Sequence, residues 1–87
     1  MDEITFAEIE LLLLIAVSQS PNSVKDIAAA SGIKASTLYK WKTANVHLST
    51  KKAEALLTYF YENEPFILKL AIITETVLLL LLTNTDY

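Results

Sequence analysis

Residues 24–43 read VKDIAAASGIKASTLYKWKT, and this segment predicts two short helices joined by one sharp turn. Apolar residues recur at helical spacing on both sides of Gly32, the only glycine of the chain. Gly32 can adopt the positive φ that ends one helix and reverses the chain. Ser23 precedes the segment and is followed three residues later by Asp26, which is close to a capping-box pattern and predicts the start of the first helix.

The second helix of this pair is predicted to have an inward and an outward face. Ile33, Leu38 and Trp41 follow at spacings of five and three, which place them on one inward stripe. The outward positions would meet base edges if this helix entered a DNA major groove, with ordinary solvent exposure as the alternative. The predicted base-contacting residues are Lys34, Ala35, Ser36, Tyr39, Lys40 and Thr43. Tyr39 and Trp41 also raise base stacking, as in single-strand binders, although Trp41 lies on the inward stripe.

The order of these residues resembles the helix-turn-helix of DNA-binding regulators. The matching positions are Ile27-Ala28, Gly32-Ile33, Leu38 and Trp41. Ser49 to Leu57 (STKKAEALL) then opens another helix, which is similar to the Cro/C1-type (phage lambda repressor-like) family. The resemblance covers roughly Phe6 to Phe60, and it implies a repressor that acts by occupying an operator and excluding polymerase.

Two departures from that family's pattern affect the predicted contacts. Val24 stands where the family often has a glutamine that bonds a DNA phosphate, and Thr43-Ala44 stands where an Asn-Gly turn often follows. The segment Leu38-Tyr39-Lys40-Trp41 is also similar to the recognition helices of TetR-type regulators and transposases. The motif is therefore expected, while its subfamily stays open.

The net charge of −3 argues mildly against nucleic-acid binding, but the charge is unevenly distributed. Five of the seven lysines lie between Ile27 and Ala53, a span without acidic residues, and each flanking segment has five acidic residues and one lysine. A local positive surface on an acidic body can orient a protein on a polyanion. Because the chain has no arginine, we expect modest readout per base or a contribution from DNA shape.

The loop at 44–48 and the start of the next helix have features of a phosphate-binding site. Ser49 is a predicted N-cap, and Lys51 and Lys52 fall in the first turn, where a cation costs roughly 0.3–1 kcal/mol. A DNA phosphate bound to the exposed N–H groups would offset that cost, whereas simple solvent exposure is the alternative. The predicted phosphate-contacting residues are Ser23, Lys42, Asn45, His47, Ser49, Lys51 and Lys52.

An apolar helix is predicted before the motif. Thr5 and Glu8 form a capping-box pattern, and apolar residues follow at helical spacing as far as Val17. Since they occupy most of the circumference, this helix must be covered on two sides. Acidic residues precede it, which argues against a signal peptide.

A second strongly apolar helix is predicted to begin at Pro65, a residue that suits the first helical position. Its heptad-like seam consists of Phe66, Leu70, Ile73, Val77 and Leu80. A membrane span needs about 20 predominantly apolar residues, and this run is shorter and contains Lys69 and Glu75. An additional core helix of the monomer would need only one apolar stripe, whereas apolar residues occupy most of the circumference of this helix. We expect instead a homodimer interface, because helix-turn-helix proteins commonly bind paired half-sites as two-fold dimers.

Nothing in the sequence predicts an enzyme. The chain has no cysteine, a single histidine and no glycine-rich phosphate loop, and Glu62 and Glu64 are expected to lie in solvent. We therefore expect no catalytic residue, no metal and no cofactor.

These features predict an all-α fold of about five helices, with a lambda repressor-like helix-turn-helix domain at 1–64 and a C-terminal dimerisation helix at 65–87. The predicted function is that of a cytoplasmic, sequence-specific regulator of double-stranded DNA, a repressor of phage or mobile-element type, without membrane association. The alternative is a protein-interaction module with the same fold, such as an anti-repressor or antitoxin. The acidic flanks and the apolar end helices favour that alternative.

Overall fold

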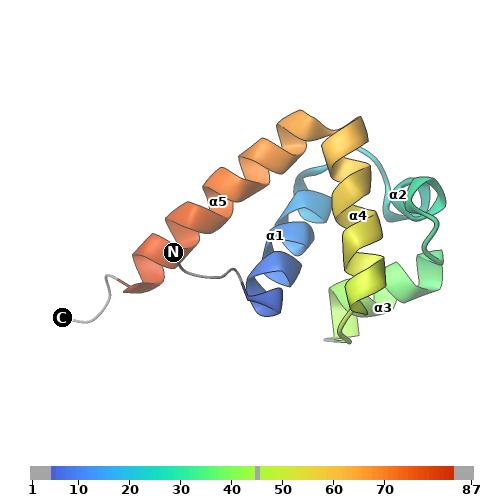
Figure 1. Ribbon diagram of the computed structural model, residues 1–87, viewed down its shortest axis with the longest axis horizontal. Helices are drawn as coiled ribbons and strands as arrows, with labels where there is room; N and C mark the ends of the chain where they lie inside the picture. Colours follow the sequence, from blue (N-terminus) through green and yellow to red (C-terminus); the bar gives the residue numbers. More distant parts are fainter. Residues whose placement is uncertain (1–4, 45, 84–87) are drawn as a thin grey trace.

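The computed structural model describes residues 5–44 and 46–83, and in these residues the chain is all-α, with five helices and no strand (Figure 1). The helices are α1 Phe6–Gln19, α2 Val24–Ser31, α3 Ala35–Ala44, α4 Thr50–Asn63 and α5 Pro65–Thr83. α1 packs against α4 and α5, whereas α2 packs against α3 and α4. The predicted all-α class is thereby confirmed.

The helices begin where the local sequence predicts. The Thr5 hydroxyl oxygen accepts the Glu8 N–H at 3.2 Å, and the Glu8 carboxylate accepts the Thr5 N–H at 2.9 Å, which completes a capping box. Ser23 and Ser49 cap α2 and α4, each accepting the N–H three residues later. Pro65 is the first residue of α5. The predicted N-termini of α1, α2, α4 and α5 are confirmed.

The turn between α2 and α3 is closed at Gly32, as predicted. Gly32 has a φ of 77°, in the left-handed region, and the N–H groups of Gly32 and Ile33 both donate to the Ala28 carbonyl. A Cβ at Gly32 would meet nothing within 4 Å, so the backbone conformation and not the available space favours glycine here. α3 begins shortly afterwards, at Ala35.

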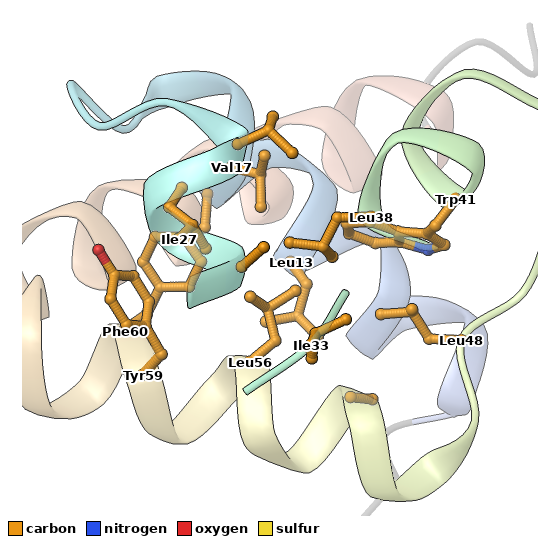
Figure 2. Packing of buried hydrophobic residues seen from close by; sticks show 14 of the residues in the cluster. Leu13, Val17, Ile27, Ile33, Leu38, Trp41, Leu48, Leu56, Tyr59 and Phe60 are labelled. Carbon is orange, nitrogen blue, oxygen red and sulfur yellow. The ribbon is translucent and has the colours of Figure 1, made fainter. Parts of the chain in front are cut away.

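One hydrophobic core holds α1 to α4 together (Figure 2). Its largest fully buried side chains are Leu13, Ile27, Leu38, Leu56 and Phe60. Ile33, Leu38 and Trp41 are at most 7% exposed, which confirms the inward stripe predicted for this part of the chain. The core therefore fixes which face α3 turns outward.

Glu64, at the corner between α4 and α5, is buried, so the prediction that it lies in solvent is wrong. Its carboxylate accepts hydrogen bonds from the Ser20 hydroxyl at 2.7 Å, the Asn22 amide at 2.9 Å and the Tyr59 hydroxyl. Burial raises the pKa of Glu64, but these bonds outweigh it and hold the pKa below its ordinary value. Burial and the bond to Glu64 raise the pKa of Tyr59 to about 12. Two of the donors, Ser20 and Asn22, are 44 and 42 residues away from Glu64 in the sequence. The residues next to Glu64 therefore do not indicate that it is buried.

α5 covers α1 with only one of its faces. Ala71 is fully buried, and the Gln19 amide donates to the Thr74 hydroxyl at 3.0 Å. The opposite face carries the predicted seam, whose residues are between 39% and 75% exposed: Phe66, Leu70, Ile73, Val77 and Leu80. The C-terminal half of α5 projects away from the other helices (Figure 1). A large apolar face is thus left uncovered by the described residues.

α5 is also the one helix of the described ranges, 5–44 and 46–83, that is long and apolar enough to cross a membrane. It has 19 residues, and an 18-residue stretch of it has a mean hydropathy of 2.2 and is only 6% buried. Length and composition alone meet this criterion, so the predicted absence of membrane association stays a prediction.

Candidate nucleic-acid interface

α3 turns most of its predicted base-contacting residues toward solvent. Lys34, just before the helix, and Ser36, Tyr39, Lys40 and Thr43 within it are exposed. The hydroxyl of Thr43 donates to the Tyr39 carbonyl at 2.7 Å, which leaves its oxygen free to accept only. These side chains could reach a partner without any rearrangement of the core.

Ala35 differs from the other predicted base-contacting residues. It is half-buried and packs against the core, so the prediction that it points outward is only partly right. As the first residue of α3, it lies where the helix meets the preceding turn. Its methyl group therefore serves packing as well as any contact with a partner.

Of the two aromatic residues of α3, only one is available for stacking. Trp41 is 7% exposed and belongs to the core, whereas Tyr39 is 50% exposed. A stacking platform on Trp41 would require opening the core, so the structure favours the core role. Tyr39 keeps the open face that a stacking or methyl contact needs.

The start of α4 has the features of an anion-binding site. The Ser49 hydroxyl oxygen accepts the Lys52 N–H at 3.2 Å, and helix geometry leaves the N–H groups of Thr50 and Lys51 without an intrahelical acceptor. Lys51 and Lys52 are both exposed, and the first turn contains no acidic residue. Two free N–H groups and two ammonium groups are therefore gathered at one helix end.

The lysines of the described residues are not committed to ion pairs. Within residues 5–44 and 46–83, no lysine forms an ion pair, and every lysine is exposed: Lys25, Lys34, Lys40, Lys42, Lys51, Lys52 and Lys69. Exposed ammonium groups that form no ion pair can neutralise phosphates at low cost.

Ser23 is exposed, and its oxygen accepts the Asp26 N–H at 3.1 Å, so its hydroxyl hydrogen remains available to a phosphate. Asn45 lies outside the described residues.

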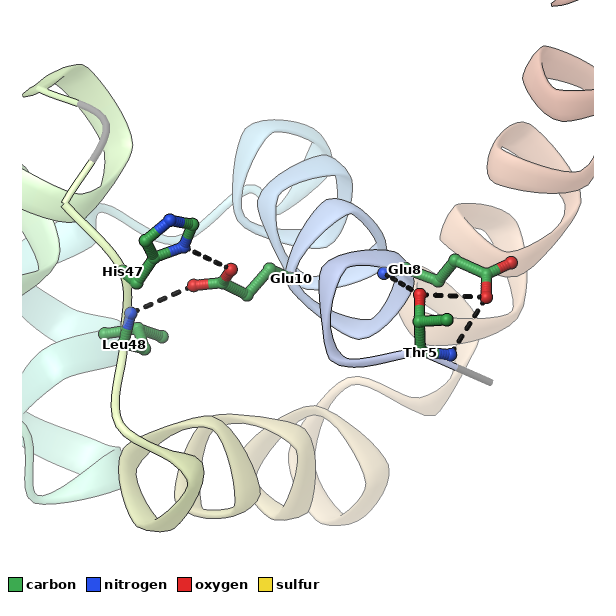
Figure 3. A network of polar contacts seen from close by, with 5 residues as sticks. All are labelled: Thr5, Glu8, Glu10, His47 and Leu48. Carbon is green, nitrogen blue, oxygen red and sulfur yellow. Dashed lines mark hydrogen bonds and ion pairs between the residues drawn. The ribbon is translucent and has the colours of Figure 1, made fainter. Parts of the chain in front are cut away.

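His47 makes a contact that the sequence did not predict (Figure 3). Its Nδ1 lies 2.8 Å from Oε1 of Glu10 in α1, and Oε2 of the same carboxylate accepts the Leu48 N–H at 2.9 Å. The Glu10 side chain is 11% exposed, whereas that of His47 is 83% exposed. Glu10 thus anchors the α3–α4 loop to α1 while the imidazole stays in solvent.

The electrostatics of Glu10 reflect this anchoring. Burial raises the pKa of the carboxyl, but the hydrogen bonds from His47 and from the Leu48 N–H, with help from Trp41, hold it below its ordinary value. Glu10 is therefore ionised at neutral pH in spite of its burial.

The burial of Glu10 is not predicted from its place near the start of α1. A signal existed, because Glu10 lies three residues before Leu13 and seven before Val17, on the same buried stripe of α1. An acid on an apolar stripe requires a partner, and here the partners are 37 and 38 residues away. No short-range pattern identifies them.

A shallow pocket lies between α1, α3 and this loop. It has a volume of about 220 Å³ and is lined by Glu10, Leu11, Leu14, Trp41, Val46 and His47. In the described part of the chain, no group of three or more histidine, cysteine or acidic residues could hold a metal ion. The pocket therefore combines the Glu10 carboxylate and the His47 imidazole with apolar side chains.

No known protein family, curated protein or solved structure matches this chain.

Proposed function

We propose that this chain is a regulator that binds double-stranded DNA sequence-specifically, as a repressor with a lambda repressor-like helix-turn-helix at residues 24–43. One observation carries the proposal: exposed lysines, none of which forms an ion pair within residues 5–44 and 46–83, lie on α3 and at the start of α4. The tight turn at Gly32 and the buried stripe of α3 support it, since they hold the outward face in a fixed orientation.

In this proposal α3 lies in the major groove. Lys34 and Lys40 donate to guanine O6 or N7, and Ser36 and Tyr39 read neighbouring base edges or a thymine methyl. Phosphates on either side are bound by the start of α4, where N–H groups and lysines act together. Repression follows from occupying an operator and excluding polymerase.

The uncovered face of α5 supports a two-fold homodimer. Nine large apolar residues of this helix are at least 39% exposed: Phe66, Leu70, Ile72, Ile73, Val77, Leu78, Leu80, Leu81 and Leu82. Soluble monomers rarely expose an apolar patch larger than a few hundred Å². Pairing two such faces buries surface toward the roughly 1,200–2,000 Å² of a stable interface.

Insertion into a membrane would also cover this face. The homodimer is the better reading because α5 is held on α1 by a side-chain hydrogen bond from Gln19 to Thr74 and carries Lys69 on its exposed side. A lysine and a polar helix-to-helix contact are costly within hydrocarbon.

Binding-site selection from random duplex DNA, with purified protein at low and moderate salt, tests the proposal. A palindromic sequence should be recovered, because two copies of α3 related by a two-fold axis read the same half-site twice. Recovery of no enriched sequence at either salt concentration would contradict the proposal.

A protein-interaction module is the second candidate, and the exposed apolar face of α5 favours it. In that case a tight hetero-complex should form with a partner protein, while no duplex DNA shifts at low salt.

A further inference from the structure

The Glu10–His47 pair joins α1 to the α3–α4 loop, which connects the two lysine-bearing helices of the proposed DNA-binding surface. In the sequence, His47 lies between Lys42, in the last turn of α3, and Lys51, in the first turn of α4. Its Nδ1 points to the Glu10 carboxylate, and its other ring nitrogen points away from Glu10 (Figure 3). The outer nitrogen, Nε2, is therefore the atom available to a partner.

The carboxylate determines which ring nitrogen carries the hydrogen. An ionised carboxylate only accepts hydrogen bonds, so the Nδ1 that lies 2.8 Å from it must be the donor. A neutral imidazole has one donor and one acceptor, which leaves Nε2 with a lone pair. Neutral His47 thus turns an acceptor outward, and an acceptor cannot bond a phosphate oxygen.

Protonation reverses this property of the outer nitrogen. Both ring nitrogens of the imidazolium are donors, so Nδ1–H stays on Glu10 while Nε2–H becomes a charged donor in solvent. Because the side chain is 83% exposed, a phosphate can approach Nε2 without displacing protein atoms.

We propose that His47 is a phosphate-binding residue of the DNA interface that takes up a proton when DNA binds, so that DNA affinity rises as the pH falls. The inference rests on the proposed DNA-binding function and adds a regulation by pH to it. The bond that forms joins Nε2–H to a phosphate oxygen, and the proton comes from solvent.

The groups around His47 are few. In the pocket that His47 lines, α1 contributes Glu10 and α3 contributes the indole of Trp41. Lys42, Lys51 and Lys52 are exposed and are the lysines nearest to His47 in the sequence. The Glu10 carboxylate accepts from Nδ1–H in both protonation states of the ring, so this contact is kept when Nε2 gains a hydrogen. A DNA phosphate supplies the acceptor for that Nε2–H.

The test measures affinity for a selected DNA site at about pH 6 and about pH 8, where histidines titrate, at equal ionic strength. Wild-type protein should bind roughly tenfold more tightly per subunit at the lower pH. Its salt slope should steepen there by about 0.9 per subunit. Calorimetry in buffers of different ionisation enthalpy should detect proton uptake on binding.

His47→Gln should abolish the pH dependence and the proton uptake, since His47 is the only histidine of the chain. Glu75 provides the matched control because it lies on α5, away from this surface. It is also titratable, and both its burial and the charge of Glu8 raise its pKa. Glu75→Gln should leave the pH dependence of DNA affinity unchanged.

Glu10→Gln gives the sharper result. A glutamine amide can donate to Nδ1 while its oxygen accepts the Leu48 N–H, so neutral His47 would carry its hydrogen on Nε2. Affinity at about pH 8 should then rise toward the value at about pH 6, and the pH dependence should shrink. Circular dichroism checks that this variant keeps its helices.

The outcomes separate this inference from the proposed function. DNA binding with the same pH dependence in wild type and His47→Gln would overturn the inference and leave the proposed function standing. Absence of DNA binding at every pH and salt concentration would overturn both.

Discussion

At the scale of single residues, Gly32 is the position where backbone conformation decides stability. Its φ of 77° costs an L-residue roughly 1–2 kcal/mol, and no neighbouring atom would clash with a Cβ. Gly32→Ala should therefore lower the free energy of unfolding by about that amount, measured by urea denaturation.

Gly32→Asn is the informative comparison for this prediction. Asparagine tolerates the left-handed region better than alanine, so it should be the less destabilising of the two. An equal loss for both substitutions would show that the conformation of Gly32 is not the cause.

Glu75 is a residue whose charge the fold disfavours. Burial, together with the charge of Glu8, raises its pKa, and its Oε2 is buried without a hydrogen-bond partner among the described residues. The ionised form is therefore destabilising at pH values above its raised pKa, and the penalty disappears as the pH falls below about 4.5, the ordinary value.

Glu75→Gln should accordingly increase the free energy of unfolding at about pH 7 by about 1 kcal/mol. The gain should vanish at about pH 4, where the glutamate of the wild-type protein is also neutral. Glu54→Gln, at an exposed position of α4, is the control and should change stability little at either pH. A gain for Glu75→Gln that persists unchanged in acid would contradict this account.

Lysines at different positions should contribute differently to DNA binding. Lys40→Ala, on α3, should cost about 1–3 kcal/mol on a site with the contacted base and relax preference at that position. Lys51→Ala, in the first turn of α4, should weaken all sequences alike and reduce the salt slope by about 1.

Binding assays on a set of operator variants at two salt concentrations separate these two effects. Lys25→Ala, an exposed lysine of α2 outside the lysine-rich span, is the control and should change neither quantity. An unchanged affinity and preference for Lys40→Ala would show that α3 is not the recognition helix.

At the scale of helices, the sequence predicted the features that are determined within a few residues. The capping serines, the threonine at the start of α1 and the glycine turn involve partners three to five residues apart, so a short pattern contains both halves of each interaction. The inward stripe of α3 follows from helical periodicity in the same way.

Buried polar contacts between helices could not be predicted by that route. Glu10 and Glu64 are held in the interior by hydrogen-bond donors from distant segments. The residues next to them in the sequence therefore do not indicate that they are buried. Ala35 was misplaced in part because the end of a helix departs from the ideal periodicity used to orient it.

α5 is the helix on which the proposed dimer depends. Ile73 lies at the centre of its apolar seam and is 60% exposed in the single chain. Ile73→Asp should leave the fold intact and remove about 3 kcal/mol or more of dimer stability, so that the Kd for dimerisation rises at least about 100-fold.

Sedimentation velocity measures this change. Thr58→Asp, an equally charged substitution on the exposed face of α4, should leave the dimer intact. A wild-type protein that sediments as a monomer at high concentration would contradict the role given to α5.

At the scale of the whole molecule, the net charge of the chain and the charge of the proposed DNA-binding surface have opposite signs. An acidic chain of net charge −3 still presents five lysines in one span without acids. We expect about four lysines of each subunit to contact phosphates. A plot of the logarithm of DNA affinity against the logarithm of salt concentration should then have a slope of about −7 for the dimer. Titrations at several salt concentrations provide the slope, and a value shallower than about −2 would contradict a lysine-bound phosphate backbone.

The carboxylate at the bend between the last two helices has a geometric consequence for any paired assembly. Glu64 ties the connection after α1 to the end of α4, just where α5 departs, through Ser20, Asn22 and Tyr59. If two copies pair through α5, this hydrogen-bonded corner sets the angle between α5 and the other helices. That angle in turn sets the distance between the two copies of α3. The spacing of the two operator half-sites would then depend on Glu64, a buried residue that does not contact DNA.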